Sequence, residues 1–194
     1  MTALDFTNNR ISDPNSGSVP ADLIDLKLEY NFLPSIPRVL KFMNSVPSID
    51  LTYNRIVSLQ GTDFPDSVTG IDLGHNSITE LNANSFPPNS GIRYLLLPNN
   101  PLSKISSSAF QNLPSLRELD LKYSKLTRLP LGLASLNNLV SIDVSGSDEL
   151  VCTCMEKSLE SKISSLLPDN VVGDCGQTSV YVFFTELSHD CSVV

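Results

Sequence analysis

The chain has 194 residues, 41% of them hydrophobic and 18% charged, which suits one folded domain rather than a disordered segment. Its net charge of −8 would repel DNA and RNA, so the composition argues against a nucleic-acid partner and favours a basic or neutral one. The sequence contains no apolar run near the roughly 20 residues that span a bilayer, and residues 1–5 lack the basic and apolar regions of a signal peptide. We therefore expect membrane contact only through a segment outside this sequence. We interpret the sequence as part of a longer protein.

One pattern recurs along residues 4–147: Leu-x-x-Leu-x-Leu-x-x-Asn-x-Leu, with isoleucine, valine or phenylalanine at some leucine positions. Its asparagines follow one another at intervals of 22, 23, 22 and 24 residues, and they are Asn9, Asn31, Asn54, Asn76 and Asn100. Ser124 and Ser147 occupy the same position in the last two units. Intervals of this size are typical of leucine-rich repeats, and the sequence resembles that family over nearly its whole length.

The resemblance implies an α/β fold, a right-handed solenoid with a curved parallel β-sheet on its concave face. The convex face would be mostly irregular or short-helical. We expect residues 1–150 to form about seven leucine-rich repeats, the first and last of them atypical, and residues 151–194 to form a C-terminal cap. Stacked repeats seal their aliphatic faces against one another, so the last repeat needs such a cap.

Two rows of side chains are predicted to hold the repeats together. The leucines of each Leu-x-Leu unit point to the same face of a short strand, because side chains alternate along a strand. The asparagine amide can bond backbone groups that the following turn leaves unpaired, so stacked asparagines would form a ladder. A serine hydroxyl has less bonding capacity, so the ladder should weaken at Ser124 and Ser147. Phe64, Phe86 and Phe110 each follow their repeat's asparagine by ten residues and are predicted to stack in the core.

All four cysteines lie in the last 43 residues. An even number in one compact segment suggests disulfide bonds and an oxidising compartment. A four-cysteine zinc site is the alternative, although the first pair, Cys-x-Cys, is closer together than zinc knuckles usually are. Apolar residues between the second and third cysteines share one helical face, which predicts a short amphipathic helix that ends before Pro168. These residues are Met155, Leu159, Ile163 and Leu166.

This segment resembles the C-terminal cysteine cap of extracellular leucine-rich-repeat proteins. In that family the first cysteine bonds the third and the second bonds the fourth, which implies the pairs Cys152–Cys175 and Cys154–Cys191. The chain departs from the family because it has no tryptophan, a residue that usually stands near the first cysteine of the cap. The resemblance extends to receptor ectodomains of the receptor-kinase type, in which a membrane helix and a kinase would follow the cap.

The concave face would display the residues that lie between and beside the strand leucines. Aspartate occupies five of the seven positions between two strand leucines, and the column two residues after the second leucine holds three tyrosines and a histidine. Such a surface would suit a basic peptide or protein segment, with the tyrosines as rigid contact area. The candidate binding residues are Tyr30, Asp50, Tyr53, Asp72, His75, Tyr94, Leu96, Asp120, Lys122 and Tyr123. The alternative interpretation is that the aspartates and aromatic residues are only the background of this repeat family.

The sequence contains no catalytic signature, such as Gly-x-Ser-x-Gly, a glycine-rich phosphate loop or His-Glu-x-x-His. We therefore predict a non-enzymatic domain, without cofactor or metal, that binds a protein, peptide or glycan ligand; any kinase would lie outside this chain. The favoured setting is the extracellular or cell-surface ectodomain of a receptor. The alternatives are a stand-alone secreted binder, inhibitor or adhesion protein, and an intracellular scaffold with reduced cysteines.

Overall fold

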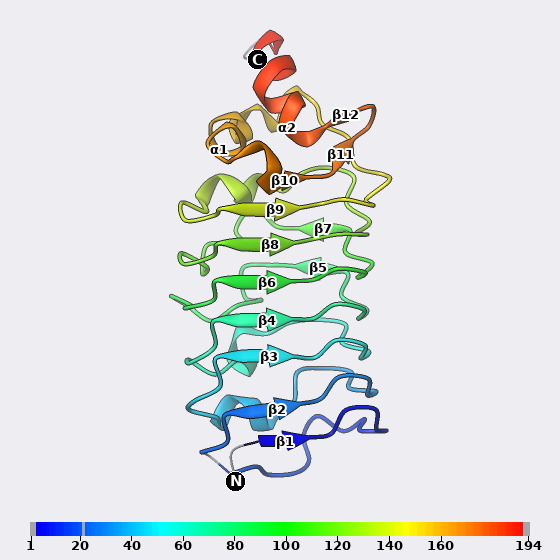
Figure 1. The fold of residues 1–194 in the computed structure, drawn as a ribbon, viewed down its shortest axis with the longest axis vertical. Coiled ribbons are helices and arrows are strands. Elements are labelled where there is room, and N and C mark those ends of the chain that lie inside the picture. Colours follow the sequence, from blue (N-terminus) through cyan, green and yellow to red (C-terminus); the bar gives the residue numbers. More distant parts are fainter. Residues whose placement is uncertain (1–2, 21, 192–194) are drawn as a thin grey trace.

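The computed structural model describes residues 3–20 and 22–191, and its coils stack into an elongated solenoid (Figure 1). Each predicted repeat contributes one short strand to a parallel sheet, in which the strands follow one another in chain order. An eighth strand from the cap completes this sheet. Its strands are β1 (Ala3–Asp5), β2 (Asp25–Lys27), β3 (Ser48–Asp50), β4 (Gly70–Asp72), β6 (Tyr94–Leu96), β8 (Glu118–Asp120), β9 (Ser141–Asp143) and β10 (Val171–Val172). The predicted leucine-rich-repeat solenoid is thus confirmed.

The central residue of each strand forms a single aligned row through the molecule. The paired residues are Leu4–Leu26, Ile49–Ile71, Ile71–Leu95, Leu95–Leu119, Leu119–Ile142 and Ile142–Val171. From Leu26 to Val171 these side chains are buried. Burying one such side chain is worth about 1.5–3 kcal/mol, so the row is a major source of the stability of the stack.

The asparagine ladder joins each coil to the preceding one. The Asn76 amide nitrogen donates to the carbonyl of Leu51 in the previous coil at 2.9 Å and to its own coil at Leu73. Its side-chain oxygen accepts the N–H of Ile56 at 2.9 Å. Equivalent bonds are made by Asn31, Asn54 and Asn100. Each asparagine therefore supplies hydrogen-bond partners to buried backbone groups that the turn would otherwise leave unpaired.

The ladder changes character at the two serines. The hydroxyls of Ser124 and Ser147 lie 2.9 Å apart and bond each other. The N–H of Leu102 stands where an asparagine oxygen accepts in the four preceding coils, and no hydrogen bond from it is found among the described residues. The predicted weakening at Ser124 is therefore confirmed, and it leaves a backbone donor of a fully buried residue without a protein partner.

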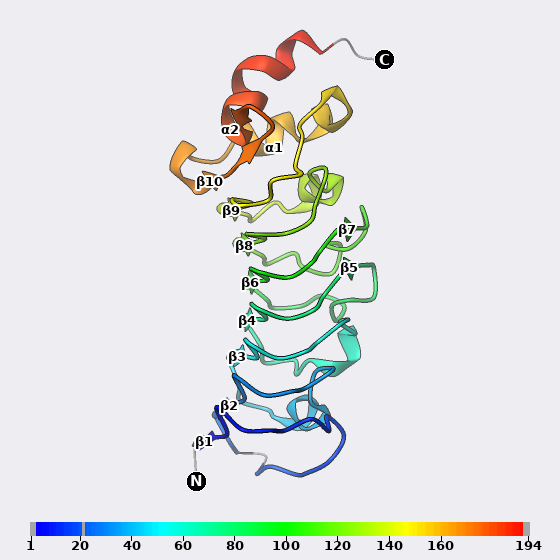
Figure 2. The same cartoon turned by 90° about the vertical axis from the view of Figure 1, so that its right-hand side faces the viewer.

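The side opposite the sheet is mostly irregular, as Figure 2 shows. It contains 3₁₀ turns at Arg38–Phe42, Gly61–Asp63 and Leu131–Ser135. A two-stranded parallel sheet of β5 (Glu80–Leu81) and β7 (Lys104–Ile105), which the sequence analysis did not predict, also lies there. The three phenylalanines of the predicted row are buried, and Phe64 stacks on Phe86 with ring centroids 6.3 Å apart.

The cap contains the disulfides Cys152–Cys175 and Cys154–Cys191, which is the pairing implied by the resemblance. A 3₁₀ segment, Cys154–Leu159, leads into α1 (Glu160–Ser164), and a further 3₁₀ turn at Pro168–Asn170 leads into β10. The hairpin β11 (Asp174–Cys175) and β12 (Thr178–Ser179) then leads to α2 (Val180–Val182). A π-helical turn at Phe183–Leu187 and a 3₁₀ turn at Ser188–Asp190 follow it.

One prediction for the cap is wrong. Leu159, Ile163 and Leu166 are buried as expected, but Met155 is 72% exposed. The first turn of this segment is a 3₁₀ helix, in which residues repeat every 3.0 rather than 3.6 positions. Met155 therefore leaves the apolar face of the helix, and its sulfur contacts the Arg128 guanidinium at 2.9 Å.

Candidate binding surface

The aspartates of the concave face have a structural task. In each case one carboxylate oxygen accepts the backbone N–H two residues later, at 2.9 Å for Asp50, Asp72 and Asp120 alike. Asp5 and Asp143 make the same bond. This contact holds the turn at the end of each strand. The interpretation of the aspartates as background of the repeat is therefore supported for one oxygen of each carboxylate.

Within the described residues, ion pairs reach the acidic row at Asp120 and Asp143, whereas Lys27 stands in register beside Asp50 without forming an ion pair. The Lys122 ammonium lies 3.4 Å from Asp120 and 3.3 Å from Asp143, and chiefly the negative charge of Asp120 raises its pKa. Asp50 and Asp72 lie side by side in register on β3 and β4. Among the described residues, no lysine, arginine or histidine forms an ion pair with either of them.

The environment of Asp72 disfavours the charged form of its carboxyl group. Burial is the main cause of a pKa above the usual range, and the neighbouring carboxylates Asp50 and Asp120 raise it further. The N–H of Gly74 and the nearby His75 act in the opposite direction. A positive group brought in by a ligand would relieve this repulsion.

The column of tyrosines and histidine owes its geometry to an unusual backbone. Tyr30, Tyr53, His75 and Tyr123 have φ angles of 55°, 56°, 55° and 55°, in the left-handed region that bulky residues rarely adopt. Asn8, Asn99 and Gly146 take the same conformation in the other coils. The left-handed backbone costs roughly 1 kcal/mol per non-glycine residue, and it aims the side chains of successive coils in one direction.

Three of these side chains form a continuous stack. The rings of Tyr30 and Tyr53 are 4.2 Å apart and 10° from parallel, and those of Tyr53 and His75 are 4.0 Å apart and 11° from parallel. Both tyrosines are more than 40% exposed. Asn99 continues the column with its amide nitrogen 3.3 Å from His75 Nε2. We call Tyr30, Tyr53 and His75 the aromatic stack.

Tyr123 does not belong to the stack, because Asn99 stands between it and His75 in the column. Its ring instead covers Gly146, where a Cβ atom would collide with it. Glycine at that position therefore serves both the left-handed backbone and the close approach of the ring. The structure thus brings together the candidate aromatic residues of the N-terminal half and leaves Tyr123 apart.

Two residues beside the stack were missed by the sequence analysis. The Arg55 guanidinium lies over the ring of Phe32, 4.3 Å from its centroid, and both residues are exposed. With the aromatic stack they line a shallow hollow of about 310 Å³. Each of them directly follows a ladder asparagine, so a third column could have been examined in the sequence.

Strand β6 brings a step of larger side chains to the middle of the concave face. Tyr94 is 45% exposed, and Leu96 is partly buried opposite Asp72 and Asp120 in the neighbouring strands. The coil before it carries Gly70 and Gly74, which have no side chains to project from the surface on that side. Of these two candidate residues Tyr94 is exposed and Leu96 is only partly so, and both lie between the strands of Asp72 and Asp120.

Comparison with known proteins places the chain among repeat proteins. A model of the leucine rich repeat matches residues 44–102 and 90–148, which together span more than half of the chain. The chain belongs to the leucine-rich-repeat family. It is also similar to lumican from Bos taurus, with 32% identity over 142 residues, and to osteomodulin from Rattus norvegicus, with 29% identity over 128 residues.

These similarities cover 71% of this chain and 41% of lumican, and 64% of this chain and 30% of osteomodulin. The chain therefore spans less than half the length of these relatives. Within residues 3–20 and 22–191, no helix is long and apolar enough to cross a bilayer. In the same residues no cluster of three or more acidic, histidine or cysteine side chains is arranged to hold a metal ion.

Proposed function

We propose that this chain is a non-enzymatic protein-binding domain that takes up a basic segment of its partner on the N-terminal half of the concave face. The observation that carries the proposal is the aromatic stack, which is exposed and lies beside the acidic pair of Asp50 and Asp72. Rings already stacked on one another lose little freedom when a partner binds, so they offer contact area at a low entropic cost.

The carboxylates of Asp50 and Asp72 favour a cationic partner. Asp50 and Asp72 have no ion pair within the described part of the chain, whereas Asp120 is already bound to Lys122. An arginine side chain could place its guanidinium against a carboxylate and its flat face on a ring. The net charge of −8 would also attract such a segment from a distance. Tyr94 and Leu96 would border the site, and Tyr123 would lie outside it.

The proposed setting is extracellular. Two disulfide bonds support it, because such bonds persist in oxidising compartments. The relatives named above lend no support to a receptor-kinase origin, so the receptor ectodomain remains a hypothesis beside a stand-alone secreted binder. The sequence of the full-length gene distinguishes these two, since only a receptor would carry a hydrophobic span.

The test is a titration of the isotope-labelled, oxidised domain with an acetylated Arg-Gly-Arg-Gly-Arg peptide, followed by amide chemical shifts. We expect shifts at the aromatic stack and at residues 50–53 and 72–75. The informative variant is Tyr53→Asn, because asparagine tolerates the left-handed backbone and occupies this column at Asn8 and Asn99. It should weaken binding about five- to tenfold through the lost ring contacts.

The matched control is Phe42→Ala, which removes an aromatic ring that is 60% exposed on a 3₁₀ turn away from the sheet. It should leave the affinity unchanged. Equal affinities of the wild type and Tyr53→Asn, or shifts confined to the convex side, would show that the aromatic stack is background of the repeat rather than a binding site.

A further inference from the structure

The shallow hollow beside the aromatic stack contains an arginine whose hydrogen-bond donors are unused. The guanidinium of Arg55 lies over the ring of Phe32, 4.3 Å from its centroid. A guanidinium carries five N–H donors. Within residues 3–20 and 22–191, the side chain of Arg55 forms no hydrogen bond and no ion pair. Phe32 therefore holds this arginine in place without occupying its donors.

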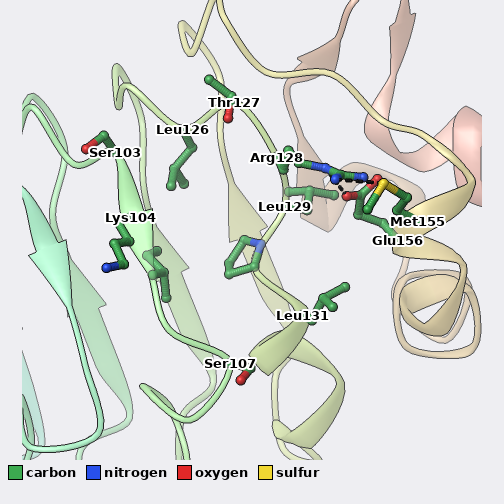
Figure 3. A pocket seen from close by; sticks show the side chains of 12 residues that line it. Ser103, Lys104, Ser107, Leu126, Thr127, Arg128, Leu129, Leu131, Met155 and Glu156 are labelled. Carbon is green, nitrogen blue, oxygen red and sulfur yellow. Dashed lines mark hydrogen bonds and ion pairs between the residues drawn. The ribbon is translucent and has the colours of Figure 1, made fainter.

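Arg128, next to the cap, has acceptors within the chain. Its guanidinium forms an ion pair with the buried carboxylate of Glu156 and donates to the Thr153 hydroxyl at 2.7 Å. Figure 3 shows this side chain pointing across to Glu156 and Met155. Arg55 carries the same donors and has no such partner among the described residues. A carboxylate brought by a ligand could therefore accept from N–H groups that no protein group uses.

The walls of the hollow also favour an anion. The hollow lies over the turns that follow β2, β3 and β4, on the right-hand side of Figure 1. Besides Phe32 and Arg55, its lining consists of the aromatic stack and the ladder asparagines Asn31 and Asn54. No acidic side chain lines it among the described residues. An incoming carboxylate would therefore be attracted by Arg55 and would not be repelled by the walls.

The aromatic stack separates this positive side from the acidic side of the surface. In the third coil the order along the chain is Asp50 on the strand, Tyr53 in the stack and Arg55 in the hollow. The pKa of Tyr30 is raised chiefly by desolvation, then by Tyr53, and also by the charge of Asp50. The field of this carboxylate thus reaches the rings. A ligand that lies across the stack would contact negative groups on one side and a positive group on the other.

We propose that Arg55 binds an acidic residue of the same partner segment whose basic residue contacts Asp50 and Asp72. This inference rests on the proposed function and adds that the preferred segment carries both charges close together. A carboxylate can accept two parallel N–H bonds from a guanidinium. Phe32 is a positioning residue, because it orients Arg55 in advance and reduces the rotamer freedom that binding removes.

The test compares two acetylated and amidated peptides, Arg-Gly-Arg-Gly-Glu and Arg-Gly-Arg-Gly-Gln, on the oxidised 194-residue chain. The glutamate peptide should bind about three- to fivefold more tightly. Net charge cannot cause this preference, because the acidic protein attracts the more positive glutamine peptide from a distance. The side-chain Nε–H signal of Arg55 should shift chiefly with the glutamate peptide.

Three variants sharpen the test. Arg55→Gln should abolish the preference for glutamate and leave the affinity for the glutamine peptide unchanged, whereas Arg55→Glu should make the glutamate peptide the weaker ligand. Phe32→Leu keeps an apolar residue but releases the guanidinium, so the preference should fall to about twofold. The matched control is Arg117→Gln, which removes an exposed arginine just before β8, at the opposite end of the strands, and should leave the preference unchanged.

The two proposals fail in different ways. If neither peptide shifts the aromatic stack at millimolar concentration, the basic-segment site is wrong and the role of Arg55 is wrong with it. If both peptides bind the stack with equal affinity, the basic-segment site stands and only the role of Arg55 is overturned. A preference for glutamate that survives Arg55→Gln, or that Arg117→Gln abolishes equally, would overturn it as well.

Discussion

The coils before and after Leu102 are held together by different means. On the N-terminal side, each coil from the second to the fifth has a buried asparagine that donates to and accepts from the backbone of the preceding coil. On the C-terminal side, two serine hydroxyls bond each other, and the stack ends in a cap fixed by two disulfides. In a solenoid each coil contacts only its neighbours, so each junction must be stable by itself. The two ends of the stack therefore depend on different interactions for their stability.

The largest expected effect is the loss of a cap disulfide. The variant Cys154→Ser with Cys191→Ser opens a link over 37 residues and should lower the free energy of unfolding by about 3–4 kcal/mol. Urea unfolding of the oxidised protein measures this. Cys152→Ser with Cys175→Ser opens a link over 23 residues and should cost about 0.4 kcal/mol less by the chain-entropy relation. Losses below 1 kcal/mol for both would mean that packing alone holds the cap.

The second prediction concerns the strong half of the ladder. Asn76→Ala leaves the buried Ile56 N–H without a partner and removes the shorter of two bonds to the Leu51 carbonyl, which Asn54 also supplies, so it should cost about 2–3 kcal/mol. Ser124→Ala removes a bond between two hydroxyls and a long bond of 3.4 Å from the Leu126 N–H, and it should cost only about 1 kcal/mol. The two variants are compared by urea unfolding in the same buffer. Equal losses would contradict the difference between the two halves.

The third prediction tries to transfer the strong ladder to the weak half. Ser124→Asn should place an oxygen where the N–H of Leu102 can donate and an amide near the carbonyl of Leu97. We expect a gain of about 1 kcal/mol in the free energy of unfolding. Slower amide hydrogen exchange at Leu102 would report the new bond directly. A destabilised variant with unchanged exchange would mean that Ser147 leaves no room for the longer side chain.

The smallest effect concerns the acidic row. The pKa of Asp72 is raised in the folded state, mainly by burial, so the folded state holds a proton more tightly than the unfolded state does. This contribution to stability is therefore present at low pH and is lost as the pH rises from 3.8 through the raised pKa. Asp72→Asn keeps an acceptor for Gly74 and cannot ionise. It should exceed the wild type in stability at pH 7 by a fraction of 1 kcal/mol and lose that advantage near pH 3, as urea unfolding at both pH values would measure. An advantage independent of pH would contradict this cause.

Much of the fold follows from the sequence because the same pattern of aliphatic residues and asparagine recurs in successive repeats. The aligned aliphatic row, the ladder and its weakening at Ser124 were all predictable from alternation and hydrogen-bonding capacity. Strand β10 was not predicted, since two residues in the cap carry no periodic signal. The exposure of Met155 was missed because a helical period of 3.6 was assumed where the chain forms a 3₁₀ turn.

The sequence predicted which candidate residues share a column, but it did not predict how their side chains contact one another. The columns of the sequence correctly placed Tyr30, Tyr53 and His75 on one line. They could not reveal that the Tyr123 ring covers Gly146, or that Lys122 bridges Asp120 and Asp143. Such contacts depend on side-chain rotamers and on the charge of the next coil, which a single column does not encode.

The left-handed residue in every coil also limits how this surface can evolve. Valine, isoleucine and threonine are poorly tolerated at such φ angles, because a branched Cβ clashes with the backbone. Substitutions at Tyr30, Tyr53 and His75 are therefore confined largely to flat rings, asparagine, aspartate and glycine. A lineage that changes its ligand along this edge must therefore exchange aromatic rings, asparagine, aspartate and glycine. New specificities would arise from these few residue types, combined differently from coil to coil.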